Sequence, residues 1–156
     1  PSGQSATVKD IQTLDGSLES ATAGQSVTIL LDEYLDISRG DLLAAAAQPS
    51  TILKTVNADV CWLSEEPLDL RRKYWLKHTT KQVAARVAKV DTLLDINTQE
   101  RRPAETLKLN DIARISVNVQ QPIAADAYQD IRATGAFILI DEVSHQTVAA
   151  GMIRID

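Results

Sequence analysis

Apolar and polar side chains alternate along residues 112–120, IARISVNVQ, with Ile and Val on one face. A two-residue period is typical of a β-strand that buries one face and leaves the other in water. Similar runs recur along the chain, each bounded by residues that favour turns. We predict strands at residues 5–11, 26–32, 55–63, 73–79, 112–120, 134–140 and 146–153.

Residues 81–90, KQVAARVAKV, fit two patterns. Ala, Arg and Lys favour a helix, whereas Val83, Ala85 and Val87 follow the two-residue period of a strand. Because Thr79–Thr80 would make a hairpin corner, we interpret the segment as a strand. The chain then has about nine or ten strands and no long helix, which indicates an all-β barrel or sandwich.

The chain changes character near Gln48–Ser50, where Pro49 interrupts the pattern. Residues 1–50 carry two basic and seven acidic side chains, a net charge of −5, whereas residues 51–156 carry fourteen of each. We therefore predict two domains, at residues 1–48 and 49–156. In the first, the mostly apolar residues 26–32 are expected to form a buried strand.

The composition is that of a soluble globular protein, with 44% apolar and 24% charged residues. No apolar run approaches the length needed to cross a bilayer. The N-terminus lacks the features of a signal peptide, and a single cysteine, Cys61, excludes an internal disulfide. We expect a cytoplasmic protein, and a chain that is the C-terminal portion of a longer one.

The sequence offers little for catalysis. It contains neither GxxxxGK[ST] nor GxGxxG, and no Cys/His cluster spaced for zinc. His78 shares a strand face with Tyr74 and Leu76 and is interpreted as a structural histidine, while His145 lies in a turn. Cys61 is interpreted as a small buried hydrophobic residue. We therefore expect no catalytic, cofactor-binding or metal-binding residue in this chain.

Basic residues in predicted loops are candidates for contact with a partner or a neighbouring domain. Arg39-Gly40-Asp41 spells an adhesion tripeptide, but a three-residue match is better explained as a turn glycine between charged neighbours. The candidate contact residues are Arg39, Asp41, Arg71, Arg72, Arg101, Arg102 and Arg132.

Several segments resemble the second and third domains of elongation-factor-Tu-type GTPases, namely AGQSV (23–27), SRGDLL (38–43), RRKYWLKHTT (71–80) and residues 121–153. Within that superfamily the chain is most similar to the family of GTPase subunits, called subunit 1, of bacterial sulfate adenylyltransferase. The matching segments follow in order as DISRGDLL (36–43), WLSEEPL (62–68), YWLKHTT (74–80), DINT (95–98), LNDIAR (109–114) and RATGAFILID (132–141).

The resemblance implies an antiparallel Greek-key β-barrel, like the third domain of elongation factor Tu, preceded by part of a second β-barrel. It also implies a complex that makes adenylyl sulfate and diphosphate from ATP and sulfate, driven by GTP hydrolysis. GTP and Mg²⁺ would be bound by an N-terminal domain outside this chain. The chain itself would dock the catalytic subunit, subunit 2, and relay the GTP state without catalysing a step.

Two further expectations follow. If residues 1–47 are part of a barrel, their strands have unpaired edges, which need another partner. An alternative function is the tRNA-binding barrels of a translation elongation factor, although equal numbers of basic and acidic residues in 51–156 and a 4% aromatic content disfavour it.

Overall fold

The computed structural model describes residues 3–155. Their contacts divide the chain into two units, residues 3–38 and residues 39–155. The break predicted from the sequence, at residues 48–50, is later, whereas the contacts group residues 39–48 with the second unit. The assignment of residues 1–48 to part of a second barrel stays a prediction.

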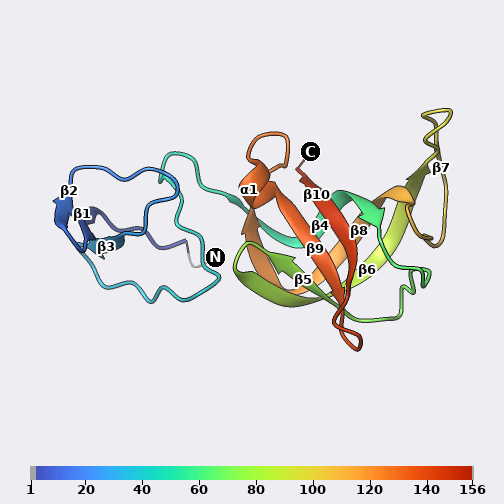
Figure 1. Ribbon diagram of the computed structural model, residues 1–156, viewed down its shortest axis with the longest axis horizontal. Helices are drawn as coiled ribbons and strands as arrows, with labels where there is room; N and C mark the ends of the chain where they lie inside the picture. Colours follow the sequence, from blue (N-terminus) through green and yellow to red (C-terminus); the bar gives the residue numbers. More distant parts are fainter. Residues whose placement is uncertain (1–2, 156) are drawn as a thin grey trace. The chain divides into compact units, whose positions relative to one another are not determined.

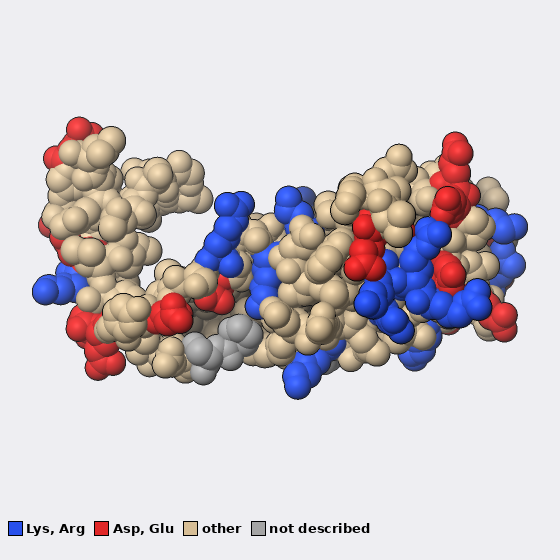
Figure 2. Space-filling model, turned by 90° about the horizontal axis from the view of Figure 1, so that it is seen from below, with Lys and Arg blue, Asp and Glu red and all other residues tan. Residues whose placement is uncertain are grey.

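The first unit is a three-stranded antiparallel sheet of β1 (Val8–Thr13), β2 (Gly16–Leu18) and β3 (Thr28–Leu31), in the order β2-β1-β3. The strand predicted at residues 26–32 is present as β3, but its predicted burial is wrong, because Ile29 and Leu30 are 41% and 38% exposed. Residues 3–38 form these three strands and no second layer that would cover them. The charged atoms of this unit in Figure 2 are mostly Asp and Glu.

The second unit is a closed barrel of six antiparallel strands (Figure 1). Around the barrel the order is β5-β9-β10-β4-β8-β6, and pairing of β5 with β6 closes the ring. The strands are β4 (Thr51–Trp62), β5 (Tyr74–His78), β6 (Lys81–Leu94), β8 (Ile112–Ala125), β9 (Ala136–Asp141) and β10 (Thr147–Arg154). The connections from β4 to β5 and from β8 to β9 pass over other strands, and the predicted all-β Greek-key barrel is confirmed.

The two-residue period identifies the inner face of the barrel. In β5, Tyr74, Leu76 and His78 are buried as predicted, and Lys77 between them is exposed. Residues 81–90 are a strand, as interpreted, and β6 continues to Leu94. It can do so because register shifts between Val87 and Thr92 let the strand bend around the barrel.

Two short elements lie outside the barrel wall. The two-residue strand β7 (Arg101–Arg102) pairs with the end of β6, so the prediction that these arginines lie in a loop is wrong. The one-turn helix α1 (Arg132–Gly135) leads into β9.

Loops close one end of the barrel. The N–H of Leu68 donates to the carbonyl of Leu107 at 2.9 Å, and both side chains are buried in the core. The indole N–H of Trp62 donates to the carbonyl of Glu66 at 2.9 Å, and the Trp62 ring meets Tyr74 edge-on at 6.0 Å. These contacts hold the segment that carries the candidate residues Arg71 and Arg72.

Candidate functional site

Arg72 lies in a charge cluster at the β9–β10 turn. Its guanidinium group donates to Glu66 at 2.8 Å and to Asp141 at 3.2 Å. The other Asp141 oxygen accepts the backbone N–H of Ser144 at 2.7 Å and that of Val143 at 3.1 Å. The Ser144 N–H is the main cause of a lowered pKa for the buried Asp141 carboxyl. This cluster shapes the turn, and its ionic groups are already paired.

A second cluster brings three arginines to one carboxylate on the outer face of the barrel. Asp59 on β4 accepts from Arg101 at 2.9 Å, from Arg154 at 3.2 Å and from Arg114 at 3.3 Å. Partial burial raises the pKa of Asp59, but the hydrogen bond from Arg154 and the charges of Arg101 and Arg114 outweigh it, so that the pKa lies below its ordinary value. The carboxylate of Asp59 therefore holds three guanidinium groups together on the outer face.

Beside this cluster, apolar side chains line the outside of the wall. Ile138 on β9 is paired with Ala150 on β10, which is paired with Cys61 on β4, and Cys61 is paired with Ile112 on β8. In the neighbouring row, Met152 lies between Ala136 and Asp59 and is 44% exposed.

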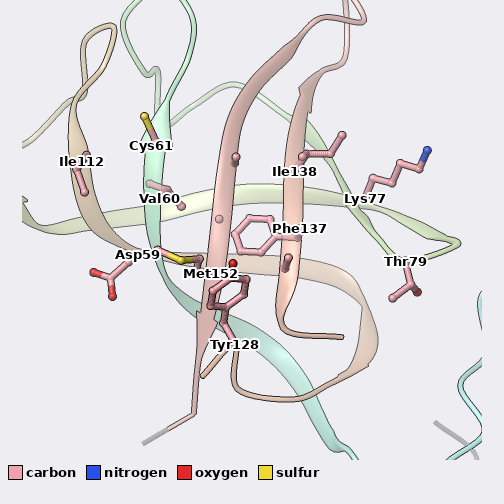
Figure 3. Close-up of a pocket in the computed structure, with 13 residues that line it drawn as sticks. Asp59, Val60, Cys61, Lys77, Thr79, Ile112, Tyr128, Phe137, Ile138 and Met152 are labelled. Carbon is pink, nitrogen blue, oxygen red and sulfur yellow. The ribbon is translucent and has the colours of Figure 1, made fainter. Parts of the chain in front are cut away.

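These side chains line an open groove of about 580 Å³, with Asp59 at one edge and Lys77 at the other (Figure 3). We call this surface the groove face, and define it by Ala136, Ile138, Ala150, Met152, Cys61 and Ile112.

One end of the groove is formed by the loop before β9. Tyr128 lines the groove, and its backbone N–H donates to the carbonyl of Ile153 at 2.9 Å. The Arg132 guanidinium lies 5.9 Å from the centre of the Tyr128 ring, a cation–π arrangement. The loop can approach closely because Gly135 has no side chain; a Cβ there would lie 2.3 Å from the Tyr128 Cα.

Of the seven predicted contact residues, the structure brings Arg101 and Arg132 to the borders of the groove face. The others lie elsewhere: Arg71 is 93% exposed and contacts Asp69, and Arg72 is in the turn cluster. Arg39, Asp41 and Arg102 are exposed, and Arg102 acts electrostatically on Asp95. Sequence reasoning missed Asp59, Arg114 and Arg154 and the groove itself.

His78 is a structural histidine, as interpreted. Its ring is buried, and Nε2 lies 2.7 Å from the carbonyl oxygen of Thr134. Cys61 is only partly buried and lines the groove, so its interpretation as a core residue is wrong. His145 is exposed in its turn, with a φ of 58°.

Residues 3–155 contain no group of three or more His, Cys, Asp or Glu side chains placed to hold a metal ion. None of the helices formed by these residues has the length and apolar character needed to span a membrane.

Comparison with known proteins identifies relatives of the chain. Residues 55–154 match the family model described as GTP-eEF1A C-terminal domain-like. Sulfate adenylyltransferase subunit 1 of Laribacter hongkongensis is 40% identical over 99% of this chain. The protein of the same name from Teredinibacter turnerae is 42% identical over 97% of this chain. In both cases the match spans 32% of the relative's length.

Solved structures share the fold. The crystal structure of sup35 complexed with GMPPNP superposes with a TM-score of 0.82, covering 98% of this chain and 38% of that one. The structure of sup35 complexed with GDP gives a TM-score of 0.80 over 95% of this chain and 37% of that one. The sequence identity is 19% in both cases, so these matches support the architecture alone.

Proposed function

The chain belongs to the GTP-eEF1A C-terminal domain-like family, and from this premise we propose that it is the barrel region of the GTPase subunit of sulfate adenylyltransferase. Its role there is to dock the catalytic subunit. The observation that carries the proposal is 40–42% identity, over nearly the whole chain, to proteins named subunit 1 of that enzyme. A subunit 1 implies at least one further subunit, and the groove face offers a surface for it.

The reaction proposed for the complex is the cytoplasmic formation of adenylyl sulfate and diphosphate from ATP and sulfate, driven by GTP hydrolysis. The chain spans about one third of the length of its curated relatives. Its residues do not themselves fit GTP or Mg²⁺, since the sequence has no phosphate-binding GxxxxGK[ST] loop. We place GTP and Mg²⁺ on the part of the GTPase subunit that this chain does not cover.

The closed barrel suits a docking and relay role. Each of its six strands is paired on both sides, and its core includes Trp62, Leu76, Ile115 and Leu139, each at most 1% exposed. Close packing of this kind resists deformation, so a barrel moves as a rigid body when an attached domain switches. Movement linked to GTP hydrolysis would thereby reach a subunit bound to the barrel wall.

Titration of the 156-residue chain into purified catalytic subunit, followed by calorimetry, tests the proposal. We expect one-to-one binding with a dissociation constant in the micromolar range or below. Absence of binding at high micromolar concentration would count against docking.

A tRNA-binding role makes a different prediction. It requires binding of tRNA in a filter assay, with an affinity that falls steeply as salt rises. The arginines at Asp59 favour this role, but residues 51–156 carry equal numbers of basic and acidic side chains. We expect no tRNA retention at physiological salt.

A further inference from the structure

We propose that the groove face is the docking surface, and that it receives a partner segment whose apolar side chains are flanked by carboxylates. This inference rests on the proposed function and adds to it the site of contact and the chemistry of the partner.

The groove face is apolar where an outer barrel wall is usually polar. Strands of an antiparallel sheet with one solvated face normally alternate apolar and polar side chains. Here the pairs Ile138–Ala150, Ala150–Cys61 and Cys61–Ile112 place four apolar side chains side by side across four strands. Covering such a surface is favourable by roughly 25 cal/mol per Å² of apolar area buried.

Positive charge lies at the borders of the groove face. Three guanidinium groups contact the carboxylate of Asp59 at one edge, and Lys77 lies at the other. Arg132, on the Tyr128 ring, adds a cation at the end of the groove. Lys89, the next cation beyond the cluster, is paired with Asp91 at 2.6 Å. The excess positive charge complements a partner that carries Asp or Glu on both sides of its apolar residues.

A partner protein fits this surface better than the alternatives. The groove is open along the outside of a sheet, whereas a small ligand is usually enclosed over most of its surface. A symmetric contact with a second copy would bring the arginines of the two Asp59 clusters to the same interface, where they would repel one another. A nucleic acid would bind favourably to the cations, but its phosphates would make no favourable contact with the apolar floor of the groove.

The test compares charge substitutions on and off the groove face in the 156-residue chain. Ala150→Glu puts a carboxylate at the centre of the floor, and Arg114→Glu reverses a charge at its edge. Val143→Glu is the matched control for the first, because Val143 is 82% exposed in the β9–β10 turn. Lys54→Glu, at an exposed position of β4, is the control for the second.

We expect Ala150→Glu to weaken binding of the catalytic subunit at least tenfold, as substitutions at the centre of an interface do. Arg114→Glu should also weaken it at least tenfold, because it places a carboxylate opposite the carboxylates of the partner. Val143→Glu and Lys54→Glu should change it less than threefold. Thermal denaturation checks that each variant is folded. As a measurement that needs no variant, wild-type affinity should fall as salt rises.

Each other outcome overturns the inference in a distinguishable way. If the wild-type chain binds and all four variants bind equally well, the docking site lies elsewhere and only this inference fails. If the wild-type chain does not bind, the proposed function fails as well. If sedimentation shows a dimer that Ala150→Glu dissociates, the occupant is a second copy. Retention of tRNA that is lost in Arg114→Glu would assign the face to nucleic acid.

Discussion

Substitution of Gly151 by alanine should destabilise the barrel through a single contact. Gly151 lies in β10 with its missing side chain directed into the core, directly opposite Phe137 on β9. An added Cβ would lie 2.3 Å from Phe137 Cζ and 2.4 Å from Cε1. Carbon atoms pack at about 3.5–4.0 Å, so the ring would have to shift by at least about 1 Å.

The expected loss in the free energy of unfolding depends on the space around the Phe137 ring. Phe137 is 3% exposed in a closely packed core, so a shift of the ring displaces its neighbours. Overpacking of this kind costs about 1–3 kcal/mol. Alanine regains about 0.5–1 kcal/mol relative to glycine within a strand. The net loss in the free energy of unfolding is therefore about 1.5 kcal/mol.

Urea denaturation followed by tryptophan fluorescence measures this loss. With a typical slope of about 2 kcal/mol per molar, the midpoint should fall by about 0.7 M. A double-mutant cycle with Phe137→Leu gives the sharper result, because a shorter side chain leaves room for the Cβ. In that background Gly151→Ala should be neutral or stabilising. An equal cost in both backgrounds would refute the steric argument.

Three further predictions concern stability. Asp141→Ala removes one of the two carboxylates that Arg72 contacts and leaves the N–H groups of the turn without their acceptor, so we expect a loss of about 2 kcal/mol in the free energy of unfolding, measured by thermal denaturation. Because the pKa values of Asp59 and Asp141 are lowered in the fold, the unfolded chain binds more protons in acid. The contribution of these two carboxylates to stability is fully present above about pH 4–5 and is lost as the pH falls through their lowered pKa values. The free energy of unfolding should therefore be lower at pH 3 than at pH 7, which denaturation at the two pH values measures. Asp59→Asn should reduce this difference. Gly135→Ala should cost about 3 kcal/mol, more than Gly151→Ala, because its Cβ meets the Tyr128 backbone.

The inner face of the barrel could be predicted because burial imposes a two-residue period. In β8, Ala113, Ile115 and Val117 are all buried, and their spacing alone identifies the strand. The burial predicted for residues 26–32 is based on their apolar composition, and it is wrong because burial also needs a second layer of structure packed against the strand. The strand predicted at residues 112–120 is longer in the structure, since β8 passes through Pro122 to Ala125 with a shift of register against β4.

The Asp59 cluster could not be predicted, because it depends on the pairing of strands that are distant in sequence. Asp59 lies 55 residues from Arg114 and 95 residues from Arg154. Each arginine alone has the outward position expected of a solvated side chain. Only the register of β4 against β8 and β10 brings them together, and a shift by one residue would separate them.

One sequence signal did point to the groove face. Residues 136–140, AFILI, are apolar at every position, so β9 presents apolar side chains to both sides of the wall. Phe137 and Leu139 are the side chains that β9 packs into the core of the barrel. Ala136 and Ile138 then remain on the outside, where they add little to folding until something covers them. A strand that is apolar on both faces of the barrel wall is therefore better explained by association than by the stability of the barrel itself.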